Sequence, residues 1–376
     1  MDFSTTEGQR DLAGLTREIL DQEVTPDRLA EVEAGADRFD RALWDKLAEA
    51  GVLAAALPSS VGGSDLGVLE QCSVLAEIGR AVAPVPYWAS VAVAASAIAQ
   101  FGDDEQREKW GAPAAAGRSV LAPALVEENG PDPSAPTTWA EHDGSWRLTG
   151  AKTTVPAGGI AEAFLVPATT PDGPSVFLVT AEDEGVELER QHVVDGDCEA
   201  HLQLRDVRLG DDRLLGPAGG GAEITAWLTA RGSIGLCAHQ LGVTEKALEL
   251  TADYAKDRVQ FDRPIGSFQA VSQRLGDAYM DVEAIRLTLW QAAWRLREGL
   301  SCDTEIATAK FWAADAGHRV AHTAVHVHGG VGIDVDNEPH RYFVAAKRNE
   351  FTLGGATAQL LKIGAALDSP EVAAQT

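Results

Sequence analysis

The sequence is poor in positive charge and in cysteine. Its 376 residues include 31 Lys and Arg against 57 Asp and Glu, which gives a formal net charge of −26. Such a surface repels phosphate groups, so nucleic acids and anionic membranes are poor partners. The four cysteines, Cys72, Cys198, Cys237 and Cys302, lie far apart without a CxxC pair. This spacing argues against a disulfide scaffold and favours reduced thiols in a cytoplasm.

Several common sequence signals are also missing. No apolar run reaches the length of a membrane span, and the start MDFSTTEGQRDL has no basic region followed by an apolar stretch. No GxGxxG follows an expected strand and no GxSxG occurs, which argues against a dinucleotide-binding fold and a serine hydrolase. We therefore expect a cytoplasmic protein of another class. Its 45% apolar content is enough for a large core.

Apolar periodicity predicts an α+β fold in three domains. Helical spacing extends over residues 1–118, strand-like alternation such as SWRLTGAKTTV and PSVFLVTAE over 119–213, and helical spacing again over 214–376. Three stripes of apolar residues are expected to be buried: Leu43, Leu47 and Ala50; Leu241, Leu248, Ala252, Ala255 and Val259; Ile306, Ala309, Ala313, Ala316 and Val320.

Segments rich in small residues are expected to be connections. GAPAAAGR (111–118) is predicted as a linker and DSPEVAAQT (368–376) as a frayed end. GPAGGGAE (216–223) precedes a helix, where its amides could bind an anion, but it lacks the Lys-Ser/Thr ending of a phosphate loop. A flexible domain junction is the favoured interpretation.

Histidines recur along one expected helix. His318, His322 and His326 follow each other every four residues, with His328 close behind, a spacing that would place three imidazoles on one helix face, as metal ligands would be. The neighbouring acids Asp315 and Asp334 are poorly placed, and the surrounding residues form an Ala/Val stripe. No metal site is therefore predicted.

The most specific pattern is RVQFDRPIGSFQAVSQRLGD (258–277), followed by AVHVHGGVGID (324–334) and HRYFVAAK (340–347). In order and spacing it resembles the acyl-CoA dehydrogenases, whose pattern reads R.QFG.PIG.FQ, then Q.HGG.G, then RY.RDAK. WDKLAEAGVLAAALPSSVGG and EIGRAVAPVPY also match that family's N-terminal helices, so the resemblance covers nearly the whole chain. It implies an acyl-CoA dehydrogenase fold: an N-terminal helical domain, a middle small β-barrel-like domain and a C-terminal four-helix bundle.

The resemblance also implies a cofactor and its contacts. A diphosphate needs a fixed cation, for which an Arg fork suits better than Lys, and close backbone approach needs glycine. The resemblance implies that FAD is bound mainly by a neighbouring subunit and that six residues of this chain contact it. They are Arg258, Phe261, Gln269, His326, Gly329 and Gly330. The alternative is an amphipathic helix broken at Pro264, with Phe261 and Phe268 as core aromatics. An oligomer, an acyl-CoA thioester substrate and an electron-transfer flavoprotein as electron acceptor are implied as well.

The family's catalytic base has no counterpart at its usual places. The implied reaction removes the α-proton of an acyl-CoA with a carboxylate while the β-hydrogen leaves as hydride to flavin. Relatives place the Glu at one of two positions, which here hold Ala230 and Leu353. Neither residue accepts a proton, so no catalytic residue is predicted. Glu350 stands three residues before Leu353, where a helix-end salt bridge or capping role is favoured.

The middle domain departs from the family pattern too. The stretches TEP..GSD and W.TN, which hold the flavin ring and ribityl chain in the family, read VEENGPDPS and TTVPAG here. Thr154 stands in place of the flavin-stacking Trp, and Pro156 removes an amide and a hydroxyl. The intrinsic half of the FAD site is thus degraded, while the half offered to a neighbour is kept.

Three functions are consistent with these residues. The favoured one is a partner subunit that resembles the base-lacking chain of actinobacterial heteromeric (α2β2) acyl-CoA dehydrogenases of sterol side-chain degradation, a heterotetramer. The second is a self-sufficient homotetramer whose base is Glu350, Glu127 or Glu128. The third is a repurposed fold, such as a flavin monooxygenase or a binding scaffold.

Overall fold

The computed structural model describes residues 4–128, 130 and 132–367, which form two compact units. The helical unit comprises Met1–Pro26, Val68–Ala83 and Ser233–Thr376, and the sheet unit comprises Asp27–Gly67 and Pro84–Gly232. Each unit joins segments that are distant in the sequence. The expected domains 1–118, 119–213 and 214–376 divide the chain by sequence segment and stay a prediction. The expected frayed end at 368–376 lies outside the described residues.

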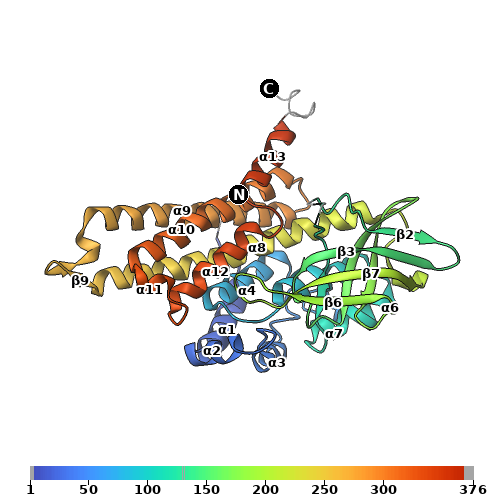
Figure 1. Cartoon of the computed structure of the whole chain (residues 1–376), viewed down its shortest axis with the longest axis horizontal. Helices are drawn as coiled ribbons and strands as arrows, with labels where there is room; N and C mark the ends of the chain where they lie inside the picture. Colours follow the sequence, from blue (N-terminus) through green and yellow to red (C-terminus); the bar gives the residue numbers. More distant parts are fainter. Residues whose placement is uncertain (1–3, 129, 131, 368–376) are drawn as a thin grey trace. The chain divides into compact units, whose positions relative to one another are not determined.

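The helical unit is built from long helices and one short hairpin. Its helices are α1 (Glu7–Glu23), α4 (Val68–Ala81), α8 (Gly221–Asp257, in this unit from Ser233), α9 (Gln269–Arg297), α10 (Asp303–His328), α11 (Gly330–Ile333), α12 (Glu338–Phe351) and α13 (Ala356–Leu367). The hairpin pairs β9 (Val259–Gln260) with β10 (Arg263–Pro264), and the 3₁₀ turn η5 (Ile265–Ser267) leads into α9. Helices α9 and α10 lie side by side, and α12 and α13 pack on α10 (Figure 1). No described helix is long and apolar enough to cross a membrane.

Two of the predicted apolar stripes lie in the helical unit. The stripe from Ile306 to Val320 is buried throughout on α10, which confirms that prediction. On α8, Leu241 and Ala255 are buried, but Val259 is 53% exposed. The prediction was wrong there because α8 ends at Asp257 and Val259 begins the hairpin. Periodicity alone does not locate a helix end.

Helices α4 and α8 cross at two glycines. A Cβ on Gly79 would lie 2.1 Å from the carbonyl oxygen of His239, and one on Gly242 would lie 1.8 Å from that of Ala76. Real Cβ atoms do not approach that closely, so the missing side chains set the distance between the two helices. The close crossing places polar side chains of both helices within reach of each other.

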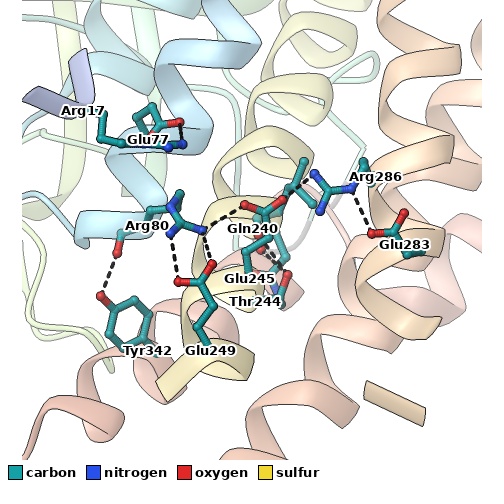
Figure 2. A network of polar contacts seen from close by, with 11 residues as sticks. Arg17, Glu77, Arg80, Gln240, Thr244, Glu245, Glu249, Glu283, Arg286 and Tyr342 are labelled. Carbon is teal, nitrogen blue, oxygen red and sulfur yellow. Dashed lines mark hydrogen bonds and ion pairs between the residues drawn. The ribbon is translucent and has the colours of Figure 1, made fainter. Parts of the chain in front are cut away.

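A network of ion pairs surrounds this crossing (Figure 2). Arg80 of α4 lies 3.2 Å from Glu245 and 2.9 Å from Glu249 of α8, and Arg286 of α9 lies 2.6 Å from Glu245. The hydroxyl of Tyr342 on α12 donates to the carbonyl of Arg80 at 2.6 Å. Four helices are thereby joined through this network.

The sheet unit contains an eight-stranded mixed sheet in the order β6-β7-β3-β2-β4-β5-β8, with β1 paired in parallel to β4. Its strands are β1 (Leu121–Pro123), β2 (Trp139–His142), β3 (Trp146–Val155), β4 (Ala163–Thr170), β5 (Gly173–Thr180), β6 (Val186–Gln191), β7 (Glu199–Leu209) and β8 (Leu214–Leu215). Alternate residues such as Leu148, Phe164, Phe177 and Leu202 form its core. The α+β prediction is therefore confirmed.

The other segments of the sheet unit are short helices. They are α2 (Pro26–Glu33), α3 (Arg41–Glu49), η1 (Ser59–Val61), η2 (Tyr87–Ala95), α5 (Ser96–Phe101), α6 (Asp104–Gln106), η3 (Arg107–Gly111), α7 (Ala112–Ala115) and η4 (Asp211–Arg213). Leu43 and Leu47 are buried on α3 as predicted, but Ala50 is exposed because it follows the helix end. The expected linker at 111–118 is wrong, since Ala114 and Ala115 are buried on α7.

Candidate functional site

The β9–β10 hairpin presents Phe261 to solvent. Phe261 and Asp262 form its tip with φ of +52° and +63°, in the left-handed region that few residues other than glycine adopt. The Phe261 side chain is 87% exposed, and its ring meets Phe268 edge to face at 6.2 Å between centroids. The core-aromatic interpretation of Phe261 is therefore wrong. The hairpin turn thus holds an exposed aromatic ring on a backbone conformation that bulky residues rarely adopt.

Arg258 and Gln269 border the same hairpin. The N–H of Arg258 donates to the carbonyl of Tyr254 at 2.9 Å, and its carbonyl accepts from the N–H of Ile265 at 2.8 Å. These bonds fix the backbone of Arg258, while its exposed guanidinium makes no hydrogen bond or ion pair with the described residues. Gln269 is the first residue of α9, and its side chain is likewise exposed.

The turn after α10 contains the two predicted glycines. Helix α10 ends at His328, whose ring stacks on Tyr254 at 4.5 Å and whose Nδ1 lies 2.8 Å from the carbonyl of Ala324. Gly329 adopts φ of +66°, which explains a glycine there. A Cβ on Gly330 would meet nothing within 4 Å, whereas one on Gly332 would lie 2.9 Å from the Cα of Val325. Packing within the chain therefore requires Gly332 to be small but leaves open space at Gly330.

His326 and Gly329 line a common hollow. This hollow of about 490 Å³ is lined by Arg274, His322, Val325, His326, Gly329 and Ile333. The structure thus brings together two of the six predicted cofactor residues, and adds Arg274 and His322, which the sequence analysis did not assign to the cofactor. Arg258, Phe261 and Gln269 do not line it, but their hairpin and the start of α9 lie toward the same end of the helical unit as α11 (Figure 1).

The histidine spacing produces a polar cluster. The rings of His318 and His322 are 4.2 Å apart, and Lys347 Nζ lies 2.8 Å from His318 Nδ1. Burial, followed by the charges of His318 and Lys347, lowers the pKa of His322 below its usual value. Among the described residues, no three His, Cys, Asp or Glu side chains are grouped as a metal site would require.

Glu350 has partners at the end of α12. Its carboxylate lies 2.5 Å from Lys347 Nζ and 3.2 Å from His318 Nδ1, so the predicted helix-end salt bridge is present. Leu353 follows in a turn with φ of +57°. The fully buried Lys310 holds this turn, because its Nζ donates to the carbonyls of Asn349, Glu350 and Gly354 at 2.9, 3.2 and 3.2 Å. Burial lowers the pKa of Lys310 to about 8.

Glu127 is saturated with hydrogen-bond donors. Lys152 Nζ donates to it at 2.6 Å, and the N–H and hydroxyl groups of Thr137 and Thr138 donate at 2.5 to 3.0 Å. Burial alone would raise the pKa of Glu127, but these donors outweigh burial and hold its pKa at about 2. A carboxylate of this kind is a poor proton acceptor near neutral pH. Glu128 is exposed beside it, and two other residues of VEENGPDPS, at 129 and 131, lie outside the described residues.

The segment that replaces W.TN retains an irregular backbone. The ladder between β3 and β7 shifts register between Lys152 and Val155, and Thr154 adopts φ of +47°. The amide of Thr154 donates to Gln191 Oε1 at 2.6 Å. That amide is therefore already satisfied within the sheet unit, and the small exposed side chain of Thr154 offers no aromatic surface to a flavin.

Comparison with known proteins gives consistent matches. The family model described as acyl-CoA dehydrogenase, N-terminal domain, matches residues 6–118, and that of the C-terminal domain matches residues 219–367. The chain is 49% identical over 372 residues to acyl-CoA dehydrogenase FadE27 of Mycobacterium tuberculosis, covering 97% of this chain and 98% of that protein.

Solved structures agree with these matches. A chain of the ChsE4-ChsE5 complex from Mycobacterium tuberculosis is 49% identical, with a TM-score of 0.94 over 98% of this chain and 100% of that chain. A chain from a variant of the Tcur3481-Tcur3483 steroid ACAD is 42% identical, with a TM-score of 0.91 over 98% and 99%. Sequence and fold agree over nearly the whole chain, which therefore belongs to the acyl-CoA dehydrogenase family.

Proposed function

We propose that this chain acts in FAD-dependent α,β-dehydrogenation of an acyl-CoA, as the subunit that completes the FAD site of a catalytic partner chain. The ChsE4-ChsE5 structure is described as a complex of two differently named proteins, and the Tcur3481-Tcur3483 structure as a steroid ACAD. Their similarity to this chain supports a heteromeric assembly and a sterol-derived acyl thioester as the substrate.

The observation that carries the proposal is that Arg258, Phe261 and Gly330 face outward, and that the Arg258 guanidinium has no hydrogen bond or ion pair among the described residues. The Arg258 guanidinium is exposed, Phe261 stands at a strained tip, and the space in front of Gly330 is open. A fixed cation, an aromatic ring and accessible backbone are the groups expected to bind a dinucleotide. Because a strained, exposed aromatic tip costs stability, a ligand held by another chain explains why it is present.

The residues of the reaction divide between the two chains in this proposal. FAD, when bound, accepts the β-hydrogen of the acyl chain as a hydride, and a carboxylate must take the α-proton. Ala230 and Leu353 occupy the two expected positions here. Glu127 is held as a carboxylate by Lys152, and Glu350 is paired with Lys347. We therefore assign the base to the partner chain.

Co-expression with a family member that carries the Glu tests the proposal. We expect a stable complex that retains FAD and whose flavin absorbance bleaches when an acyl-CoA is added without oxygen. The variant Arg258→Gln in this chain should lower flavin retention without separating the chains. Arg297→Gln is the matched control, because Arg297 is exposed on α9 and pairs with the neighbouring Glu298. Equal flavin retention in the two variants would refute a cofactor role for Arg258, and a complex that retains no FAD would refute the proposed function.

A further inference from the structure

We propose that Arg274, in addition to Arg258, binds a phosphate group of FAD. The hollow lined by Arg274, His326 and Gly329 would accept the nucleoside diphosphate part of that cofactor. This inference rests on the proposed function and adds a residue to it. Three independent observations support it: the charge pairing along α9, the composition of the hollow, and the open backbone at its edge.

Arg274 is the exception among the arginines of its helix. Helix α9 has four arginines, and three are ion-paired within the chain: Arg286 with Glu245 and Glu283, Arg295 with Glu305, and Arg297 with Glu298. The exposed guanidinium of Arg274 makes no hydrogen bond or ion pair with the described residues, although Asp277 lies one turn further along the helix. Arg274 is thus the one arginine of α9 without an acidic partner among the described residues, which leaves its charge available to a ligand.

The hollow offers both polar and apolar contacts to a nucleotide. Arg274 and His326 provide hydrogen-bond donors on its wall, and Val325 and Ile333 provide apolar surface. Its volume of about 490 Å³ lies within the range of roughly 300–1,000 Å³ typical of small-molecule sites. An anionic group with an attached planar ring matches this lining better than a purely apolar ligand.

The edge of the hollow allows a ligand to approach the backbone. Gly329 lines it, and a Cβ on either Gly329 or Gly330 would meet nothing within 4 Å. Burial lowers the pKa of the neighbouring His322, which disfavours the charged form of this imidazole. Arg274 is the arginine of the hollow, and its planar guanidinium fork suits phosphate oxygens.

The test uses the complex with the base-bearing partner. Arg274→Gln, Arg274→Lys and the control Arg297→Gln would be compared by titrating the flavin-depleted complex with FAD and following flavin fluorescence. Losing a charged hydrogen bond should raise the Kd for FAD about tenfold or more in Arg274→Gln, with a smaller rise in Arg274→Lys. The salt dependence of the Kd should also decrease in Arg274→Gln. ADP should compete with FAD less well in that variant than in the control.

The possible outcomes separate this inference from the proposed function. Size-exclusion chromatography establishes that each variant still assembles with its partner. If the unsubstituted complex holds FAD and Arg274→Gln binds it as tightly as Arg297→Gln does, the role of Arg274 is refuted while the proposed function stands. If Arg274→Gln separates the chains instead, Arg274 is a subunit contact and the inference also fails. If the unsubstituted complex holds no FAD, the proposed function itself fails.

Discussion

Replacing Glu127 should destabilise the sheet unit rather than remove a catalytic base. Lys152 is 0% exposed, and its ammonium donates to Glu127 at 2.6 Å. Glu127→Gln would leave that ammonium buried without a counter-charge, and the loss of one partner of a buried pair costs about 3–5 kcal/mol. The neighbouring Glu128→Gln is the matched control. Because Glu128 is exposed, its replacement should change the free energy of unfolding by no more than about 0.5 kcal/mol.

The same pair predicts a dependence of stability on pH. The pKa of Glu127 is about 2 in the folded chain against a reference value of 4.5. Because the pKa is lower in the folded chain, the ionised carboxylate stabilises the fold in full when the pH is above the pKa of the unfolded chain. This stabilisation is lost as the pH falls through the interval from 4.5 to about 2. The unfolding free energy of Glu127→Gln should therefore fall less than that of the unsubstituted chain over this interval.

Urea unfolding combined with hydrogen exchange in β2 and β3 measures both effects in the sheet unit. The double variant Glu127→Gln with Lys152→Met should be more stable than Glu127→Gln alone, because it removes the unpaired charge. If Glu127→Gln unfolded within about 1 kcal/mol of the unsubstituted chain, the structural role would be refuted. If the same variant abolished flavin bleaching in the complex, Glu127 would instead be the base.

Three further substitutions test the packing and the glycine turn. Arg80→Ala should lower the free energy of unfolding by about 1.5–3 kcal/mol in a denaturant titration. The control Arg41→Ala should lower it by no more than about 1 kcal/mol, because the ion pair of Arg41 is exposed. Equal losses in the two variants would contradict a stabilising role for the network. Gly242→Ala should cost at least about 3 kcal/mol, seen as a lowered Tm, because its Cβ would overlap the backbone of α4; an unchanged Tm would show that the helices can separate. Gly330→Ala should keep the Tm of the isolated chain but weaken FAD retention in the complex, whereas Gly332→Ala should lower the Tm; identical behaviour of the two would oppose a ligand role for Gly330.

Sequence patterns predicted the regular parts of the fold well. The buried stripe on α10 and the strands β3 and β7 follow from periods of 3.6 and 2, whereas the predicted strands β4 and β5 are buried along most of their length on both faces. Strand β6 was not predicted: its residues, VELERQ, alternate between apolar and polar only over the first four, and all six are exposed or half-buried. Helix ends were misplaced at Ala50 and Val259, since a stop is set by local turn geometry that apolar spacing does not report.

The candidate site was only partly predictable. The motif residues Arg258, Phe261 and Gln269 could be selected from the sequence, but their outward orientation depends on the hairpin geometry. Arg274 gave no signal, because the absence of a partner among the described residues is a property of the folded chain. Lys152 did give a sequence signal, because it occupies an inward position of an alternating strand. A buried lysine needs an acidic side chain nearby to balance its charge. Which acid it pairs with depends on a contact 25 residues away in sequence.

The flavin content of the purified chain without any partner tests the central claim most directly. The chain would be incubated with excess FAD, passed through a desalting column, and mixed anaerobically with acyl-CoA thioesters while its absorbance is recorded. We expect little retained flavin and no bleaching, because this chain offers outward-facing cofactor contacts but has Ala230 and Leu353 where a base would be. Stoichiometric FAD that a thioester reduces would contradict the account.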